Sequence, residues 1–331
     1  MKSHIPLDPI ERAIEFSNQG GLIGLPTETV YGLAAPIDSE EQLKKIFEIK
    51  ERPLFDPLIV HIHDTKQALD LCLDWTPLCD SLAESFWPGP LTLVLKRNPK
   101  TISSLITAGL ETVGVRCPSH PVAQDFLRRL GKPVAAPSAN KFTKTSPTKA
   151  KDVTDAFRPE DVFVLDGGEC EVGVESTIVL VEEMKLTILR KGMITSNEIL
   201  EQMQRKQITV DVVFDTTPME KQMTAPGQMA AHYRPVHPVV IVTEKDFQRR
   251  TQDILKSFDL QKSESLALRT LSNQAYLAAR ELYETLKRPL IGQEKVLVLC
   301  LPEIEKNQKE IEKWEAILDR LKKAAILSFL P

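Results

Sequence analysis

Hydroxyl groups, a carboxylate and a phenol follow one short apolar segment near the start of the chain. Leu22–Leu25 predicts a buried strand, and Pro26–Gly32, which reads Pro-Thr-Glu-Thr-Val-Tyr-Gly, comes directly after it. In open α/β sheets, ligands collect beyond strand ends of this kind. The cluster therefore predicts a polar binding site at the strand end, although an ordinary capped turn would have the same composition.

A second cluster joins two cations at the predicted end of a helix. Lys50 and Arg52 flank Glu51, and Pro53 forces the chain into an extended or turning path there. Lysine can bind a triphosphate as a point charge, and arginine can bind it as a planar fork. Taken alone, the pair is equally consistent with a solvated surface turn.

A third cluster follows another predicted buried strand. Ala136–Asn140 reads Ala-Pro-Ser-Ala-Asn, and its small residues allow a ligand to approach the backbone. Ser138 and Asn140 can form hydrogen bonds with phosphate oxygens, while Lys141 and Lys144 add positive charge. The alternative interpretation is a Ser/Asn turn with solvated lysines.

Two further polar side chains lie within predicted strands. Arg116 ends the strand Val113–Arg116, and a cation there is costly unless it is paired or lines a cleft, where it could clamp a carboxylate. His61, in Leu58–Ile62, is either part of that site or a core histidine. Neither a Walker loop, nor a dinucleotide-binding glycine motif, nor a catalytic-triad signature occurs in the sequence.

The elements that must position these groups alternate between helical and strand patterns. Asp8 and Pro9 predict a helix start and Gly20 its end, and a second helix runs from Ser39 to near Lys50. The short strands and their varied connections predict a mixed α/β sheet. The remaining predicted elements of this first part are the helices Asp80–Phe86 and Ser119–Leu130 and the strands Leu58–Ile62, Leu91–Leu95, Val113–Arg116, Val134–Ala136, Val162–Leu165 and Thr177–Val181.

A segment rich in Pro and Gly divides the chain. We expect a first domain over 1–210, a linker over 211–238, and a smaller α/β domain with a parallel sheet over 239–331. The linker is either a lid over the site or a passive tether. In the second domain the predicted strands are Val239–Val242, Ser265–Leu268 and Val296–Leu299, and the predicted helices are Phe247–Phe258, Ala275–Leu286 and Ile311–Lys323.

Composition narrows the function classes. A chain of 331 residues suggests roughly two domains. The net charge of -4 argues against a general polyanion binder, so any phosphate site must be local. Five scattered cysteines fit neither a zinc site nor a disulfide framework. With no bilayer-length apolar run and no signal-peptide core near Met1, we expect a cytoplasmic protein without a membrane partner.

The clusters together resemble a known family. Lys50-x-Arg52 followed by Ser138-x-Asn140 is similar to the signature of YrdC-type domains. Ala225–Pro235 resembles the segment that joins the two domains of Sua5 proteins, so the chain is identified as a member of the two-domain Sua5/YrdC/YwlC family over essentially its whole length. Four further segments match the family in order and spacing: Pro26–Gly32, Pro57–His61, Pro88–Thr92 and Val113–Arg116.

The resemblance implies both a fold and a reaction. It implies a YrdC-like twisted mixed sheet with a basic concave face, and a second, smaller Rossmann-like α/β domain. It implies a nucleotidyltransferase that converts L-threonine, bicarbonate (or CO2) and ATP into L-threonylcarbamoyladenylate and pyrophosphate. That product would feed the t6A37 modification of tRNA, which a separate threonylcarbamoyl transferase complex completes.

The resemblance also implies roles for particular residues. Lys50 and Arg52 would be catalytic, by stabilising charge on the phosphates. Mg²⁺ would accompany ATP without a dedicated protein site. L-threonine would contact Thr27, His61, Arg116 and Ser176. ATP would contact Lys50, Arg52, Thr112, Ser138, Asn140, Ser146, Arg190 and Tyr233, the last closing over the nucleotide.

The sequence departs from the family pattern in two places and leaves two rival functions. Asp56 stands where many relatives carry Asn, and Ala230-Ala231 replaces an extra aromatic found in some of their linkers. An RNA-binding module without activity is one rival, which the acidic charge and 6% aromatic content disfavour. A carbamoyl-transfer enzyme is the other, which the lack of Cys-x-x-Cys disfavours.

Overall fold

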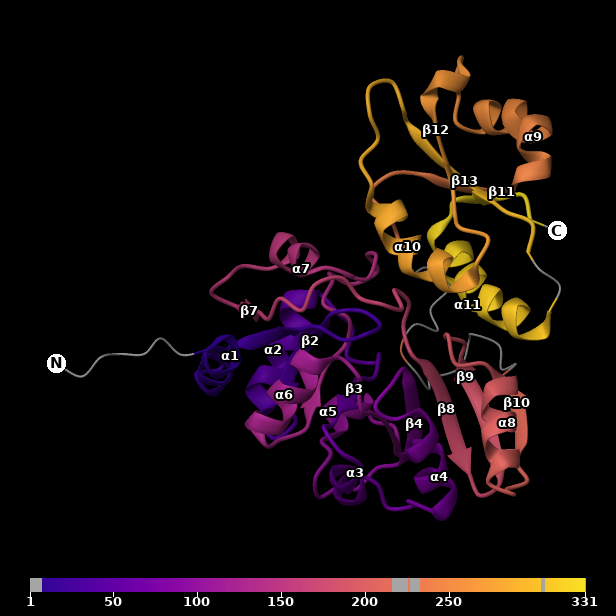
Figure 1. The fold of residues 1–331 in the computed structure, drawn as a ribbon. Helices are drawn as coiled ribbons and strands as arrows, with labels where there is room; N and C mark the ends of the chain where they lie inside the picture. The colour runs from indigo at the N-terminus through magenta and orange to yellow at the C-terminus, as the bar shows by residue number, and fades with distance from the viewer. Residues whose placement is uncertain (1–7, 216–225, 227–232, 305–306, 331) are drawn as a thin grey trace.

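Two sheets organise the computed structural model, which describes residues 8–215, 226, 233–304 and 307–330 (Figure 1). The first sheet has ten strands and the second has four. In spatial order the first sheet consists of β10 (Asp211–Phe214), β9 (Lys185–Arg190), β8 (Thr177–Glu182), β4 (Leu91–Lys96), β5 (Thr112–Arg116), β3 (Ile59–His61), β6 (Val134–Ala135), β2 (Gly32–Pro36), β1 (Leu22–Leu25) and β7 (Val162–Val164).

The first sheet is mixed, as predicted. The pairs β1–β7, β3–β5, β4–β8 and β9–β10 are parallel, whereas β1–β2, β4–β5 and β8–β9 are antiparallel. Because parallel strands need crossover connections, helices lie between many of them. These helices are α1 (Pro9–Asn18), α2 (Glu40–Lys50), α3 (Thr65–Leu71), α4 (Pro77–Phe86), α5 (Ser104–Thr107), α6 (Pro121–Leu130), α7 (Ala150–Ala156) and α8 (Ser196–Arg205).

The helix ends follow from capping chemistry. Asp8 accepts a hydrogen bond from the backbone of Glu11, with a proline at the first helical position, so α1 starts where predicted. Ser39 caps α2, which ends at Glu51 in a left-handed conformation (φ 57°). The predicted starts of α4 and α6 are wrong by a few residues, because Pro77 and Pro121 each occupy a first helical position.

The second sheet is parallel throughout, which confirms the prediction. Its order is β12 (Leu266–Thr270), β13 (Val296–Leu301), β11 (Val239–Thr243) and β14 (Leu327–Ser328). A short 3-10 turn, η1 (Ser263–Ser265), precedes β12. Helix α9 (Glu244–Ser257) covers one face, while α10 (Ala275–Lys287) and α11 (Gln308–Ala324) lie between the other face and the first domain (Figure 1).

The alternation of side chains along β11 explains how this sheet buries both faces. Val240 and Val242 pack with Ile254 of α9, whereas Val239 and Ile241 pack in a second cluster with α10 and α11. That second cluster also contains first-domain residues. These are Val30, Val172, Val174 and Met193.

The first sheet extends into the segment that the sequence assigned to a linker. Asp211–Phe214 pairs in parallel with β9 as an edge strand. None of its residues is fully buried, so it lacks the apolar signal of a core strand. The sheet of the first domain therefore continues beyond residue 210. Residues 216–225 and 227–232 lie outside the described residues, and much of the predicted lid segment falls among them.

Candidate functional site

Strand ends of the first sheet meet at one pocket, which contains about 580 Å3 of empty space and opens to solvent. Predicted site residues that line the pocket are Thr27, Arg52, His61, Arg116, Ser138, Ser176, Arg190 and Tyr233. The other lining residues are Thr29, Val30, Gly32, Ile59, Ala136, Pro137, Glu175 and Pro226.

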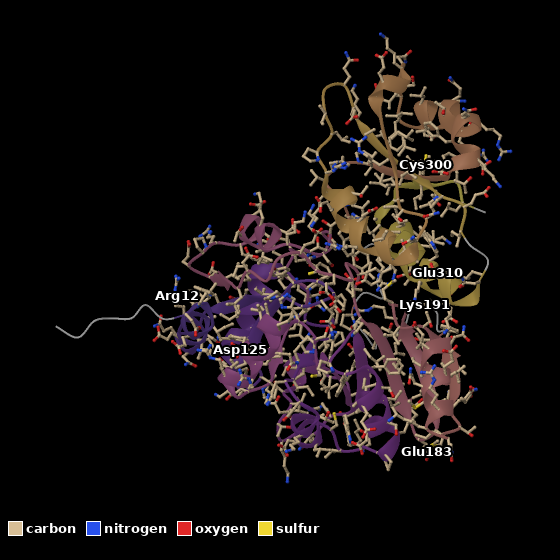
Figure 2. All side chains as sticks on the ribbon, in the orientation of Figure 1. Arg12, Asp125, Glu183, Lys191, Cys300 and Glu310 are labelled. Atoms are coloured by element: carbon tan, nitrogen blue, oxygen red, sulfur yellow. The ribbon has the colours of Figure 1, made fainter. Side chains whose placement is uncertain are left out.

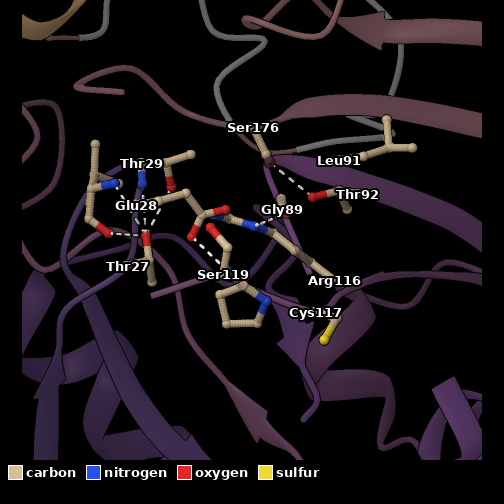
Figure 3. Close-up of polar contacts among 12 residues, drawn as sticks. Thr27, Glu28, Thr29, Gly89, Leu91, Thr92, Arg116, Cys117, Ser119 and Ser176 are labelled. Atoms are coloured by element: carbon tan, nitrogen blue, oxygen red, sulfur yellow. Dashed lines mark hydrogen bonds and ion pairs between the residues drawn. The ribbon is translucent and has the colours of Figure 1, made fainter. Parts of the chain in front are cut away.

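The turn after β1 is fixed by its own hydroxyl groups (Figure 3). The Thr27 hydroxyl donates to the Val30 carbonyl over 2.7 Å and accepts from the backbone N–H groups of Thr29 and Val30, both over 3.2 Å. Tyr31 points elsewhere, because its hydroxyl donates to the Gly168 carbonyl over 2.7 Å. The turn is therefore a rigid part of the pocket wall.

Arg116 is both paired and in a cleft. Its Nη2 donates to Glu28 Oε1 over 2.7 Å, its Nε donates to the Gly89 carbonyl over 3.3 Å, and both charged side chains are almost fully buried (Figure 3). The other oxygen of Glu28 accepts from the Ser119 backbone over 3.0 Å. Because a buried charge without a partner is costly, Glu28 holds Arg116 in one orientation. The sequence analysis noted the Glu28 carboxylate but did not predict this partnership.

His61 lines the pocket as a neutral side chain. Its Nδ1 lies 3.2 Å from the Ile59 carbonyl. Since a carbonyl only accepts, Nδ1 carries the hydrogen and Nε2 is left as an acceptor. Burial, together with the nearby charge of Arg116, lowers the pKa of His61 to about 3. His61 can therefore accept a hydrogen bond from a ligand at neutral pH.

Lys50 lies under the pocket wall and is not among the lining residues. It is 1% exposed, and its ammonium group donates to the carbonyls of Ser138 and Asn140. Burial and then the charge of Arg52 lower the pKa of Lys50. The Asn140 amide also points into the protein, donating to the Lys141 and Lys144 carbonyls over 2.8 and 2.9 Å. These two side chains therefore shape the loop whose Ser138 lines the pocket.

Arg52 lines the pocket while bound to its own turn. Its Nη2 lies 2.8 Å from Asp56 Oδ2 and donates to the Pro57 carbonyl over 2.9 Å. Burial raises the pKa of Asp56, against the lowering effect of the Arg52 charge. Neither oxygen of Asp56 accepts a hydrogen bond of good geometry from the described part of the chain, despite the close ion pair.

A third arginine belongs to the opposite wall. Arg190, at the end of β9, donates through Nη2 to the Ser176 hydroxyl over 3.0 Å and through Nε to the Ser176 carbonyl over 3.1 Å. The Ser176 hydroxyl also lies 2.8 Å from the Thr92 hydroxyl. Arg190 Nη1 donates to the Pro226 carbonyl over 3.1 Å. These contacts give Ser176 and Arg190 fixed positions on one side of the pocket.

Glu175 is a lining residue that the sequence analysis did not assign. It stands directly before Ser176, and the Ser146 hydroxyl donates to its Oε1 over 2.6 Å. Ser146 therefore contacts Glu175 and is not among the lining residues. A carboxylate beside the predicted Ser176 was the available signal, but no local pattern indicates its partners.

Thr112 lines a neighbouring apolar hollow with about 290 Å3 of empty space. Ile59 and Pro226 line both this hollow and the polar pocket, so the two adjoin. At Gly114, a Cβ would lie 3.2 Å from the Thr92 side chain. The remaining lining residues of the hollow are Pro57, Leu58, Thr92, Val94, Thr107, Leu110, Val113 and Ile178.

A larger hollow of about 1170 Å3 lies in the second domain, near Thr243–Arg250. Charged side chains of its lining pair with one another, as in Arg249 with Asp246 and Lys245 with Glu303. Within the described ranges, no group of three or more His, Cys, Asp or Glu residues is arranged to bind a metal ion. Over the same ranges, no helix has the length and apolar character needed to cross a bilayer.

Two family models match the chain. Residues 15–192 match the Sua5/YciO/YrdC model, described as telomere recombination. Residues 194–326 match the model of the threonylcarbamoyl-AMP synthase C-terminal domain. The second model begins before α8 and β10, although β10 pairs within the first sheet.

Relatives match over most of the chain. A threonylcarbamoyl-AMP synthase from Bacillus subtilis (strain 168) is 39% identical over 235 residues, 71% of this chain and 67% of that protein. One from Pyrococcus abyssi is 38% identical, covering 75% of this chain and 73% of the relative. The crystal structure of P. abyssi Sua5 complexed with L-threonine superposes with a TM-score of 0.83 at 30% identity, covering 98% of both chains.

Proposed function

The chain belongs to the two-domain Sua5 family of threonylcarbamoyl-AMP synthases, and we propose that its polar pocket seats L-threonine beside the α-phosphate of ATP. The enzyme is a nucleotidyltransferase of t6A biosynthesis, which makes L-threonylcarbamoyladenylate from L-threonine, bicarbonate or CO2 and ATP and releases pyrophosphate. The observation that carries the proposal is the convergence of Arg52, Arg116 and Arg190 on one pocket.

The threonine side of the pocket is the wall around Arg116. An arginine held by Glu28 and Gly89 offers its remaining donors to a carboxylate. Thr27 and the neutral His61 would contact the amine or hydroxyl, because His61 retains an acceptor nitrogen. Ser176 would contact the amino acid from the opposite wall. A solved relative is described as complexed with L-threonine, which supports this assignment.

The nucleotide side is the wall formed by Arg52, Arg190 and the Ser138 loop. Arginine forks suit phosphate oxygens, and the adjoining apolar hollow, with Thr112 on its lining, would contact the adenine ring. Lys50 and Asn140 would act by shaping the loop, and Ser146 by holding Glu175. Tyr233 is buried and lines the pocket, so it would bound the nucleotide on the linker side.

The chemistry needs two bond-forming steps. The threonine amine becomes a carbamate either by attacking CO2 and losing a proton or by attacking bicarbonate and releasing water. A carbamate oxygen then attacks the α-phosphorus and expels pyrophosphate. Neither step forms a covalent bond to the protein, so catalysis would rest on orientation and on stabilisation of negative charge by Arg52 and the nearby Lys50.

Mg²⁺ would accompany ATP, held by phosphate oxygens and water. Three carboxylates contact pocket arginines or line the pocket, of which Asp56 is paired with Arg52 and the other two already have hydrogen-bond donors. Glu28 is bound by Arg116 and Ser119, and Glu175 by Ser146. Their oxygens are thus poorly suited to a dedicated metal site, and the ion would supply charge neutralisation at the leaving pyrophosphate.

The domain assignment and the biological setting belong to the same proposal. The first domain would carry both substrate sites, and residues 239–331 would form the second domain. The adenylate would pass to a separate threonylcarbamoyl transferase complex that acts on tRNA, and the cytoplasm is the compartment in which that reaction would take place.

The test is threonine-dependent release of pyrophosphate from ATP by the purified chain, with the adenylate identified by mass spectrometry and no RNA present. Formation of threonylcarbamoyladenylate with bicarbonate is the expected result. RNA binding without turnover would instead support a binding module. Turnover that requires carbamoyl phosphate in place of bicarbonate would support a carbamoyl-transfer enzyme.

A further inference from the structure

One wall of the pocket is held by the second domain through Glu175. The Tyr283 hydroxyl of α10 lies 2.9 and 3.0 Å from the two oxygens of this carboxylate. Arg320 of α11 donates through Nε to Oε2 over 3.1 Å. Both second-domain side chains are fully buried. A carboxylate on the pocket wall is therefore shared between the two domains.

The donors around Glu175 leave it no role as a base. Burial alone would raise the pKa of Glu175, but the charges of Arg320 and Arg190 and the Ser146 hydrogen bond lower it to about 2. Ser146, Tyr283 and Arg320 together occupy both oxygens. Glu175 is thus permanently ionised and held in place at neutral pH.

Glu175 is connected to two residues that line the pocket, directly to Ser176 and through it to Arg190. Ser176 is the next residue, and its hydroxyl and carbonyl both accept from Arg190. The preceding backbone is clamped as well. At Gly173, which has φ +79°, a Cβ would lie 2.4 Å from the Cα of Arg280 in α10. Any displacement of α10 or α11 would therefore move Ser176 and Arg190.

The anchor on the second-domain side is equally rigid. Arg320 Nη1 donates to the carbonyls of Lys191 and Ala316, over 2.6 and 3.1 Å. Because Lys191 directly follows β9, the first of these bonds joins α11 to the end of that strand (Lys191 is labelled in Figure 2). The rings of Tyr283 and Tyr233 lie 5.6 Å apart, centroid to centroid. The second domain thus contacts Glu175, the strand end that carries Arg190, and the pocket residue Tyr233.

We propose that Tyr283 and Arg320 are positioning residues of the reaction. They fix Glu175, and through it Ser176 and Arg190, so that the second domain completes one wall of a pocket to which residues 239–331 contribute no lining residue. This inference rests on the proposed function of the pocket. It gives the second domain a role in substrate affinity although neither Tyr283 nor Arg320 lines the pocket.

The groups facing Glu175 determine how the pocket responds to pH. They are Arg320 on α11, with Asp319 beside it, Tyr283 on α10, Arg190 on β9, and Tyr233 and Ser146 on adjoining segments. Burial raises the pKa of Glu175, and the Arg320 charge lowers it, so removing that charge should raise this pKa. Glu175 should then take up a proton at higher pH than in the parent enzyme, and the pocket wall should change in that range.

The test compares Tyr283→Phe and Arg320→Met with a matched control, Glu312→Gln. Glu312 also lies on α11 and also bridges the domains, accepting from Ser196 over 2.7 and 2.8 Å, but it is not a pocket residue. Steady-state constants for ATP and threonine, melting temperatures and the pH dependence of kcat/KM are measured for all three variants and for the parent enzyme.

We expect KM for ATP to rise about tenfold in Arg320→Met and less in Tyr283→Phe, because small displacements of positioned groups carry costs of that order. As the pH falls, Arg320→Met should also lose kcat/KM at a higher pH than the parent enzyme does, in the direction expected for a buried carboxylate without its cation. Glu312→Gln should keep the parent KM values and pH profile, even if it melts earlier.

Parent-like KM values and pH profiles in both pocket-side variants would overturn the inference, and so would equal KM changes in the control. Tyr283→Phe keeps the buried ring and removes only the hydroxyl that binds Glu175. If Arg320→Met does not fold, the KM values of Tyr283→Phe alone test the inference. The proposed function is tested separately, because a parent enzyme without threonine-dependent turnover would contradict that proposal before any variant is compared.

Discussion

The two walls of the pocket are built in different ways. The wall around Arg116 is self-contained, since its partners Glu28, Gly89 and Ser119 all belong to the first domain. The wall around Arg190 depends on Glu175, which the second domain holds through Tyr283 and Arg320. One wall therefore needs only the first sheet, whereas the other needs both domains.

The difference shows how one architecture can separate two binding tasks. Both walls rely on a buried arginine–glutamate pair. Such a pair adds little net stability, yet removing one partner typically costs about 3–5 kcal/mol. In the first wall the pair includes Arg116, the arginine that itself faces the substrate. In the second wall the cost acts one step away, because Arg320 binds Glu175 and does not itself line the pocket.

Lys50→Ala should give the largest effect, because it removes the support of the Ser138 loop on the nucleotide side. Its ammonium group holds the Ser138 loop from below. We expect pyrophosphate release with threonine to fall about a thousandfold, below the detection limit of ordinary assays, as the loop and its positive field are lost. The rate is measured with saturating ATP and threonine.

Lys141→Ala is the matched control, since Lys141 lies on the same loop but binds Glu51 and the Ile49 carbonyl near the surface. It should stay within a few-fold of the parent rate, as surface charges contribute little. A near-parent rate in Lys50→Ala would refute the role assigned to Lys50.

Arg116→Ala should break the threonine side alone. We expect KM for threonine to rise about a hundredfold through loss of the carboxylate clamp, with KM for ATP nearly unchanged. Separate titrations of L-threonine and an ATP analogue by calorimetry measure the two affinities. If both affinities fall together, the walls are not independent and the comparison fails. Arg129→Ala, which removes a surface arginine paired with Asp8 and Glu11, is the control.

Acid should lower the folding stability through His61 of the threonine side at a higher pH than through Glu175 of the opposite wall. Its pKa is about 3 in the folded protein and 6.5 in an unfolded one, so below pH 6.5 the unfolded chain binds a proton that the folded one does not. Stability is therefore lost as the pH falls from 6.5 toward 3, by about 2 kcal/mol at pH 5. Glu175, whose pKa is lowered from 4.5 to about 2, contributes stability that is lost only below pH 4.5.

Urea unfolding at pH 7 and pH 5 checks this expectation. The parent enzyme should lose more stability than His61→Asn over that interval. Equal losses in the two proteins would show that His61 is not held neutral. The interval lies above pH 4.5, so Glu175 does not contribute to the difference.

Ser146→Ala should have the smallest effect. The serine reaches the pocket through Glu175, so we expect KM for ATP to rise about threefold, with a normal KM for threonine. In a double-mutant cycle with Tyr283→Phe, the two effects should not add, because both residues bind the same carboxylate. Additive effects would instead support a direct contact between Ser146 and ATP.

The sequence allowed many of these residues to be predicted because they occur in short segments whose order is specific. Arg116 at a strand end and the hydroxyls after Leu25 were identified from local chemistry alone. The direction in which a side chain points was harder to predict. Lys50 was predicted to bind phosphate together with Arg52, but only the structure shows its ammonium group turned under the loop.

Contacts between residues far apart in the chain could not be predicted from local sequence patterns. Glu175 lies 108 residues from Tyr283 and 145 from Arg320 in the sequence, and no periodic pattern connects such positions. The strand Asp211–Phe214 was missed for a related reason. An edge strand without a fully buried residue is stabilised by pairing with β9, which composition does not reveal.

A crystal structure of the chain with L-threonine and a nonhydrolysable ATP analogue tests the central claim most directly. The account predicts the threonine carboxylate on Arg116 and its amine facing the α-phosphate, with Arg52 and Arg190 on the phosphates. Nucleotide bound in the second-domain hollow near Thr243–Arg250, or threonine bound away from Arg116, would contradict it.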